Sequence, residues 1–331
     1  MQTRKLGKSG PEVSAIGLGC MAMSGLYGPA DRGEAIATIH AALDAGIDLI
    51  DTGDFYGMGH NEMLIGEALK GVPRDSYKLS VKFGALRDHG SGWNGYDARP
   101  IAVKNFLAYT LQRLGVDYID IYRPARLDPN VPIEDTVGAI AECIEAGWVR
   151  HVGLSEVGPE TLRRASAVHP ISDLQIEYAL TTRNIERAVL PACRELGIGL
   201  TVYGVFARGL LTGGWQPGAD SPGDFRHHAP RFQGEAGVRN LDVAAEIARV
   251  AQGFGMTPAQ VLLGWVLAQG EDIVPLVGAR RPSRVAEAME ALSRGLGSEQ
   301  VAELESAIPP DAVQGDRYAA AQMAMLDSER A

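Results

Sequence analysis

Residues 133–155 read IEDTVGAIAECIEA followed by GWVRHVGLS, and this stretch decides the fold. Apolar residues recur at helical spacing from Ile133 to Ala146, and Gly147 follows as a typical C-terminal stop. Val149–Ser155 is a short, mostly apolar run, as expected for a buried strand. The stretch therefore predicts one helix followed by one strand, the unit from which α/β folds are built.

The same unit recurs on both sides. Helical spacing appears again at Glu34–Ala45, Ile101–Leu114 and Ile185–Leu196, each followed by glycine. Eight strand-like runs occur, at Ala15–Met21, Ile47–Asp51, Lys78–Phe83, Ile119–Tyr122, Val149–Ser155, Leu174–Tyr178, Gly199–Tyr203 and Ile273–Val277. This alternation favours a closed parallel (β/α)8 TIM barrel, because closure covers both faces of the strands without edges; a doubly wound sheet is the alternative. We expect residues 1–331 to form one barrel domain with an N-terminal hairpin at its floor.

Composition narrows the possible partners and the compartment. The formal net charge is −10, so the chain lacks the excess of positive charge that attracts nucleic acid or anionic lipid. No signal-type or membrane-spanning apolar run occurs, so we expect a cytoplasmic protein. Cys20, Cys143 and Cys193 are far apart and are expected to be reduced thiols. His227-His228 lacks further ligands at metal-binding spacing, so we expect no metal site; monomer and homo-oligomer both stay open.

Two segments lie outside the repeat. Thr212–Arg239 is long and rich in Gly and Pro, and we expect a functional loop that covers the cofactor as a lid. Leu241–Gly253 then predicts an extra helix before the one starting at Thr257-Pro258, and further helices are expected from Ser298 onward. The polar tail from Asp311 is compatible with packing over the barrel and with disorder.

Polar residues that follow the second and third strands indicate proton-transfer chemistry. Active sites of barrels lie at the C-terminal ends of the strands, where Asp51, Tyr56 and Lys82 are found. A positively charged ammonium beside a phenol stabilises the phenolate, so Lys82 is expected to lower the pKa of Tyr56. A lysine that is buried away from water needs a carboxylate partner, such as Asp51, to stay charged. Tyr56 could then protonate a carbonyl oxygen while a hydride reaches the carbon. The alternative is a structural ion pair with Tyr56 as packing.

Six stretches in register are similar to the aldo-keto reductase family along nearly the whole chain. They are Ile47–Gly57, the strand that carries Lys82, Gly147–Glu156, Gln175–Tyr178, Ala207–Gly213 and Gly278–Arg284. The resemblance implies carbonyl reduction, with Tyr56 as general acid supported by Asp51 and Lys82.

One position departs from the family pattern. The histidine that follows the fourth strand in the family is replaced by Ala125, which predicts a wider and less polar pocket. Strand alternation predicts that the next residue, Arg126, points to the other face, away from the pocket. Trp93, Ala125 and Arg126 are nevertheless the candidate residues for the substrate pocket. The Ala-Arg-x-Asp-Pro pattern resembles the pyridoxal reductase branch. Because of Ala125, two alternatives stay open: a non-catalytic cofactor-binding regulatory subunit, and a reductase of conjugated double bonds.

The resemblance also implies a cofactor site. Ser155 and Gln175 would hold the nicotinamide carboxamide, and Tyr203 would stack on the ring. The loop Gly204-Val205-Phe206-Ala207-Arg208-Gly209-Leu210 would wrap the pyrophosphate, and Glu287 would contact adenine. Gly278, Arg280 and Arg284 follow the last strand, and arginine forks suit a phosphate, which favours NADPH over NADH.

A second glycine pattern is not expected to bind nucleotide. Gly90-Ser91-Gly92-Trp93-Asn94-Gly95 matches the Rossmann fingerprint, but polar residues separate it from the preceding strand, which ends at Phe83. We interpret it as a loop on the substrate side, with Trp93 in the pocket wall.

Overall fold

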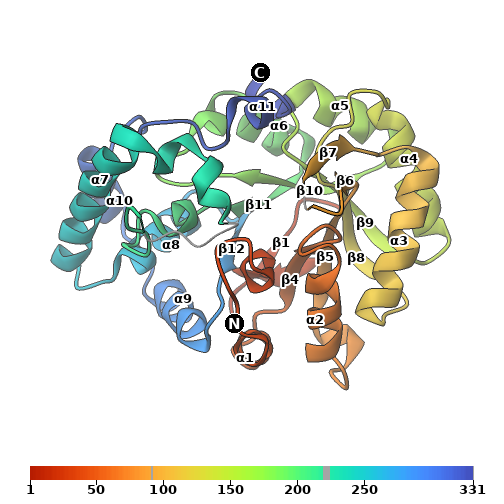
Figure 1. Cartoon of the computed structure of the whole chain (residues 1–331), viewed down its shortest axis with the longest axis horizontal. Helices are drawn as coiled ribbons and strands as arrows, with labels where there is room; N and C mark the ends of the chain where they lie inside the picture. The colour runs from red at the N-terminus through yellow and green to blue at the C-terminus, as the bar shows by residue number, and fades with distance from the viewer. Residues whose placement is uncertain (91, 219–223, 331) are drawn as a thin grey trace.

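A closed barrel of eight parallel strands forms the centre of the computed structural model, which describes residues 1–90, 92–218 and 224–330 (Figure 1). The order around the barrel is β3, β4, β5, β8, β9, β10, β11 and β12, and β12 pairs with β3 to close it. Their bounds are Gly17–Gly19, Leu49–Gly53, Lys78–Phe83, Ile119–Pro124, Val149–Ser155, Ile171–Glu177, Gly199–Tyr203 and Ile273–Gly278. All eight predicted strands are confirmed, and the doubly wound alternative is wrong.

Helices surround the barrel as an outer ring (Figure 1). They are α1 Arg32–Asp44, α2 His60–Ala68, α3 Pro100–Leu114, α4 Ile133–Glu145, α5 Pro159–Val168, α6 Val189–Leu196, α8 Pro258–Ala268 and α9 Pro282–Arg294, with α7 Gly234–Gly253 as an extra helix before α8. Thr257 caps α8 through a reciprocal capping box with Gln260, which fixes the predicted start of that helix. No helix in the described residues is long and apolar enough to cross a membrane.

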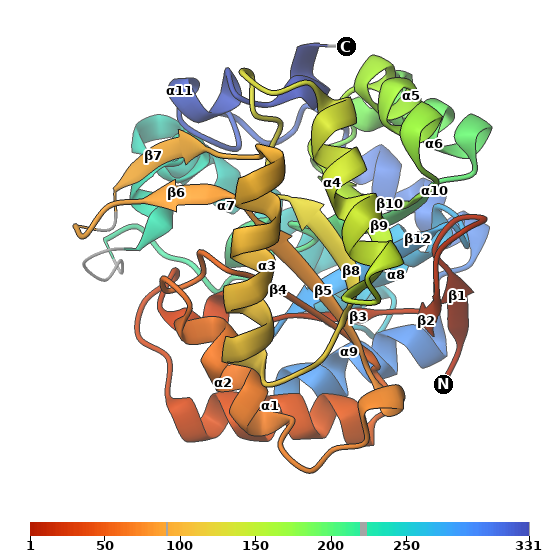
Figure 2. The same ribbon diagram turned by 90° about the vertical axis from the view of Figure 1, so that its right-hand side faces the viewer.

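Two hairpins lie at opposite ends of the barrel (Figure 2). The N-terminal hairpin pairs β1 Thr3–Lys5 with β2 Glu12–Ser14, and its Leu6 and Val13 pack in one apolar cluster with Leu49 and Ile121 from the barrel strands. This contact confirms the predicted floor. The second hairpin, β6 Ala85–Arg87 and β7 Trp93–Tyr96, follows β5 on the opposite face, so the glycine-rich stretch forms a hairpin rather than a nucleotide turn; its Ser91 lies outside the described residues.

A polar layer lies above the apolar floor inside the barrel. Inward residues alternate along a strand, so Arg123 follows Ile121 toward the upper face. The Arg123 guanidinium is fully buried and donates to Asp173 Oδ2 at 2.8 Å, Thr201 Oγ1 at 3.1 Å and Ser80 Oγ at 2.8 Å. A Cβ on Gly153 would lie 2.9 Å from Asp173 Oδ1, so the glycine leaves the space that this ion pair needs.

Both segments outside the repeat have described structure. The loop that was predicted over 212–239 contains the short 3-10 helices Phe225–His228 and Pro230–Phe232, and α7 begins at Gly234 rather than Leu241; residues 219–223 lie outside the described part. After α10, Ser298–Ala307, the tail packs on the molecule and ends in α11, Ala320–Met323, and the turn Asp327–Arg330. Figures 1 and 2 show this C-terminal segment beside α5 and α6.

The buried pair Arg123–Asp173 yields a prediction about stability. Asp173→Asn removes the charge that balances Arg123, and breaking one half of a buried pair costs about 3–5 kcal/mol. We expect Asp173→Asn to lower the apparent free energy of unfolding in urea by about 3 kcal/mol. The exposed carboxylate Asp75 supplies a matched control, Asp75→Asn, with no measurable effect. Equal stability of the two variants would contradict a role for the pair in holding the barrel together.

Candidate active site

A cavity of about 510 Å³ opens at the face of the barrel where the strands end. Each of β4, β5, β10, β11 and β12 contributes a side chain or backbone from its C-terminal half. The hairpin β6–β7, the loop with Phe225 and the C-terminal tail add the outer walls. The lining includes Asp51, Phe55, Tyr56, Lys82, Trp93, Tyr96, Arg126, Gln175, Tyr203, Arg208, Phe225, Arg280, Arg284, Glu287 and Tyr318.

Asp51, Lys82 and Tyr56 meet at the bottom of this cavity. Lys82 Nζ donates to Asp51 Oδ1 at 2.5 Å and lies 5.2 Å from the centroid of the Tyr56 ring. The other carboxylate oxygen, Oδ2, accepts from Ser80 Oγ at 2.8 Å and from Gln175 Nε2 at 2.7 Å. All five residues are buried, and the carboxylate is held by neighbours on β5 and β10.

The pKa of Tyr56 differs from the sequence-based expectation. Burial, followed by the charge of Asp51, raises the pKa of the Tyr56 phenol well above its ordinary value, and Arg126 is the cation that opposes this. The expected lowering by Lys82 is wrong in this state, because Asp51 lies against that ammonium and balances its charge. Burial also lowers the pKa of Lys82. A protonated phenol beside a cation is nevertheless the form that a general acid requires.

Comparisons with known proteins agree with this architecture. The Aldo/keto reductase family model matches residues 15–309. The chain belongs to the aldo/keto reductase family. Probable aldo-keto reductase 1 of Glycine max is 40% identical over 320 residues, which cover 96% of this chain and 92% of that protein. Aldo-keto reductase yakc [NADP(+)] of Schizosaccharomyces pombe is 39% identical and covers 96% and 94%.

Solved structures of the aldo/keto reductase family have the same fold. A glycerol dehydrogenase from Gluconobacter oxydans superposes with a TM-score of 0.82 at 28% identity and covers 93% of this chain and 96% of its own. An aldo-keto reductase from Klebsiella pneumoniae in complex with NADPH gives a TM-score of 0.73 at 25% identity, with coverage of 93% and 96%.

The position of the family histidine differs from the sequence-based picture. β8 ends at Pro124, so strand alternation does not continue into the two residues beyond it. Ala125 is buried and its N–H donates to Phe83 O at 2.8 Å, whereas Arg126 lines the cavity with Tyr56. The predicted outward direction of Arg126 and the predicted loss of polarity are therefore wrong: a guanidinium borders this part of the pocket.

The residues predicted for the nicotinamide end lie close together. Gln175 and Tyr203 line the cavity, and the Gln175 amide already donates to Asp51. Ser155 is fully buried, and its Oγ lies 3.5 Å from Arg126 Nη1. The Tyr203 hydroxyl donates to Glu156 Oε1 at 2.6 Å. The three predicted residues thus surround one end of the site, with Ser155 below its surface.

The predicted phosphate and adenine residues extend along the same cavity. Gly204, Arg208 and Gly209 line it after β11, whereas Leu210 is fully buried behind them. Buried Arg208 Nη2 has no hydrogen-bond partner among the described residues and lies 3.7 Å from Glu177 Oε2. Gly278, Arg280, Arg284 and Glu287 also line the cavity, and Arg284 pairs with Glu287 at 2.7 Å.

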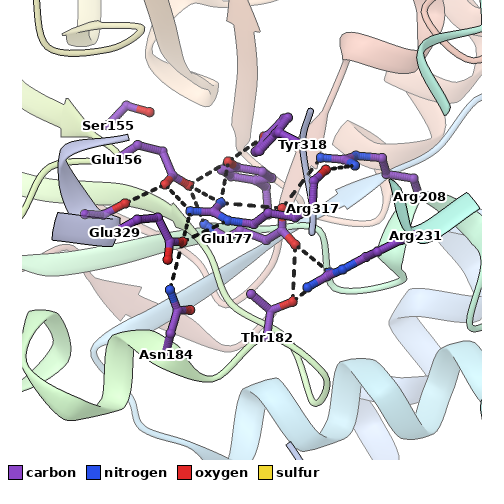
Figure 3. Close-up of polar contacts among 12 residues, drawn as sticks. Ser155, Glu156, Glu177, Thr182, Asn184, Arg208, Arg231, Arg317, Tyr318 and Glu329 are labelled. Carbon is purple, nitrogen blue, oxygen red and sulfur yellow. Dashed lines mark hydrogen bonds and ion pairs between the residues drawn. The ribbon is translucent and has the colours of Figure 1, made fainter. Parts of the chain in front are cut away.

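A cluster of charged groups fixes the tail beside Tyr203, one of the residues predicted for the nicotinamide (Figure 3). Glu156, directly after β9, is fully buried and has a φ of 54°, which is unfavourable for a residue with a Cβ. Its carboxylate accepts from Arg317 Nη1 at 2.9 Å and Nη2 at 2.6 Å, and from Ser328 Oγ at 2.9 Å. Arg317 also pairs with Glu329 at 2.7 Å. We call this cluster the tail clasp.

The tail clasp brings an unpredicted tyrosine into the cavity. Tyr318 follows Arg317, lines the cavity, and its hydroxyl lies 2.9 Å from the Tyr203 hydroxyl. Despite burial, Arg317 lowers the pKa of Glu156 to about 2, so the pair stays ionised at neutral pH. The sequence analysis did not assign Glu156, Arg317 or Tyr318 a role; the only available signal was that Glu156 ends one of the family-like stretches.

Removing the cation of the tail clasp should release the tail. Arg317→Met leaves Glu156 buried without its main partner, which destabilises the docked tail by about 3 kcal/mol or more. We expect chymotrypsin to cut after Tyr318 at least about tenfold faster, because proteolysis follows the open population. Arg330→Met is the matched control, because Arg330 is an exposed tail arginine that donates to the Ala324 carbonyl and lies outside the tail clasp. Equal cleavage of both variants, read by mass spectrometry, would contradict the clasp.

A second buried carboxyl near the site predicts a pH effect. Asp54 Oδ2 accepts from the Gly84 N–H at 3.3 Å, and Oδ1 has no hydrogen-bond partner in the described part of the chain. Burial, with a smaller effect of Glu62, raises the pKa of Asp54 to about 7. In the unfolded chain an aspartate has a pKa of about 3.9, so between these two values the native state holds the extra proton and stability falls as pH rises.

Asp54→Asn should remove this pH dependence. The variant cannot ionise, so its stability relative to wild type should be about 2 kcal/mol more favourable at pH 8 than at pH 5. Urea unfolding at the two pH values measures the difference. A stability difference between variant and wild type that does not change with pH would show that Asp54 titrates normally in the folded protein.

Proposed function

We propose that this aldo/keto reductase reduces an aldehyde or ketone to the alcohol with NADPH. The observation that carries the proposal is the buried Tyr56 phenol in a cavity with the Lys82–Asp51 pair beneath it. A carbonyl oxygen within reach of that hydroxyl accepts a hydrogen bond and then the proton. When bound, NADPH supplies the hydride to the carbonyl carbon.

The chain's own groups prepare the proton transfer. Burial keeps Tyr56 protonated before reaction, so the acid form is available at neutral pH. As the proton leaves, negative charge develops on the phenol oxygen, and Lys82 and Arg126 are the cations near it. Their positions are set before substrate arrives, so the site needs little reorganisation to stabilise the charge.

The proposed preference for NADPH over NADH rests on residues at the far end of the cavity. Arg280 and Arg284 line it, and a guanidinium fork matches the 2′-phosphate that distinguishes NADPH from NADH. The relative from Schizosaccharomyces pombe is named for NADP(+), and the Klebsiella pneumoniae structure is a complex with NADPH. Gln175 and Tyr203 would hold the nicotinamide, with Ser155 behind them, and Arg208 and the amides after β11 would hold the pyrophosphate. We place the protein in the cytoplasm as one barrel domain.

Pyridoxal belongs among the proposed substrates, on the strength of the sequence pattern around Ala125. The pocket walls that would face a small aromatic aldehyde are aromatic: Phe55 contacts both Tyr56 and Trp93 edge to face, with ring centroids 4.8 and 5.6 Å apart. Such walls suit a planar ring. The regulatory-subunit and double-bond alternatives have no comparable support in the geometry, because the proton donor and its cation are both in place.

Turnover of a panel of aldehydes, including pyridoxal, tests the proposal. NADPH oxidation is followed by absorbance, and products are identified to separate carbonyl from double-bond reduction. We expect Tyr56→Phe to lower kcat by about 10²–10⁴-fold, because it removes the proton donor, and to leave NADPH binding intact. Tyr109→Phe, an exposed tyrosine on α3, should behave as wild type. NADPH binding without oxidation of any panel member would favour the regulatory alternative.

A further inference from the structure

Arg126 is a cavity-lining guanidinium that forms no ion pair with a carboxylate in the described part of the chain, and the charge of Glu156 acts on it only from a distance. Its strong hydrogen bond goes to its neighbour, the Ala125 carbonyl, at 2.6 Å. Its other contacts are to neutral hydroxyls at 3.5 Å: Nη1 to Ser155 Oγ and Nη2 to Tyr318 Oη. Most of the donor capacity of this fork is therefore available to a molecule in the cavity.

Four other arginines around this end of the barrel each have an acid within 4 Å. Arg123 pairs with Asp173 at 2.8 Å, Arg317 with Glu156 at 2.6 Å and Arg231 with Glu177 at 3.3 Å; Arg208 lies 3.7 Å from Glu177. A cation taken out of bulk water is costly unless an opposite charge compensates it. Arg126 forms no such ion pair with any carboxylate among residues 1–90, 92–218 and 224–330.

The nearby acid cannot serve as its partner. Glu156 already accepts two bonds from Arg317 and one each from Tyr203, Ser328 and the Glu177 N–H. The tail clasp thus uses the full acceptor capacity of that carboxylate. The other polar groups that reach Arg126 are phenols and a serine, which carry no charge at neutral pH.

We infer that Arg126 binds an anionic group of the substrate, and that the preferred substrates are aldehydes or ketones that carry a carboxylate. This inference rests on the proposed function and names its substrate class. A carboxylate matches the guanidinium in charge and in its planar, two-oxygen shape. A phosphate dianion is best balanced by a second cation, and two others that line the pocket already have acids: Lys82 has Asp51 at 2.5 Å and Arg208 has Glu177 at 3.7 Å.

The tail supplies a second donor to the same subsite. The Tyr318 hydroxyl lies between Arg126 Nη2 at 3.5 Å and the Tyr203 hydroxyl at 2.9 Å, so it can turn its proton toward a bound oxyanion. Tyr318 holds this place because the adjacent Arg317 is anchored on Glu156. The tail clasp is thereby a positioning device for substrate recognition as well as a structural contact.

A matched pair of substrates tests the subsite. 4-Carboxybenzaldehyde and methyl 4-formylbenzoate have similar size and carbonyl reactivity and differ in charge. We expect wild type to prefer the carboxylate through a lower KM. Arg126→Met should lower kcat/KM for the carboxylate about 30- to 300-fold more than for the ester, as for loss of one half of a buried charge pair; the loss shared by both substrates reports the effect of Arg126 on Tyr56. Arg126→Lys should recover part of the difference, and Arg249→Met, an exposed arginine on α7, should match wild type.

Two results would overturn the inference. Wild type without preference for the charged substrate would contradict it, and so would an equal loss on both substrates in Arg126→Met, which would place Arg126 on the carbonyl oxygen or the cofactor. The dissociation constant of NADPH, measured by fluorescence, separates those two roles.

A binding measurement keeps the inference independent of turnover. Calorimetric titration of benzoate and benzamide into the NADPH complex should show benzoate binding that Arg126→Met abolishes. If neither aldehyde is reduced while benzoate still binds through Arg126, the proposed function fails and the anion subsite stands. Absence of benzoate binding to wild type overturns the subsite.

Discussion

The ion pair between Asp51 and Lys82 is the interaction on which the rest of the site depends. Both residues are buried, with 3% and 5% of their surface exposed, at the bottom of the cavity in a barrel closed below by apolar side chains. The pair is stable there because Ser80 and Gln175 satisfy the second carboxylate oxygen, and Ser80 in turn accepts from Arg123. The Asp51–Lys82 pair is therefore connected through hydrogen bonds to the polar layer around Arg123. Asp173 and Thr201 extend this network to the neighbouring strands.

The pairing of buried charges also explains how loops and the C-terminal tail are held at the mouth of the barrel. Glu156 and Glu177 balance three arginines that reach them from the loop after β11, from the 3-10 helix Pro230–Phe232 and from the tail. The tail is held over the cavity by this cluster, and the strained backbone of Glu156 is stabilised by the same contacts. Arg126 has no such ion pair, so the cavity presents its charge to whatever enters it.

The sequence predicted the chemistry of Asp51, Tyr56 and Lys82 because these residues follow strands whose ends must meet at one face of a barrel. It did not predict the direction of Arg126, because strand alternation was extended past Pro124, where the strand ends. The predicted electrostatic effect on Tyr56 was wrong for a related reason: the charge of Lys82 was considered without the distance at which Asp51 neutralises it.

Local sequence by itself determined the eight strands and the helices between them. It also determined that Asp51, Tyr56 and Lys82 lie at the same face of the barrel. These features depend on periodicity and on position along each strand, which neighbouring residues encode. Only the tertiary structure decided that the polar tail folds over the cavity, because Glu156 and Arg317 are 161 residues apart. An ion pair between residues so far apart in the chain gives no periodic pattern in the sequence. That Arg126 has no such partner can be recognised only once the positions of the surrounding acids are known.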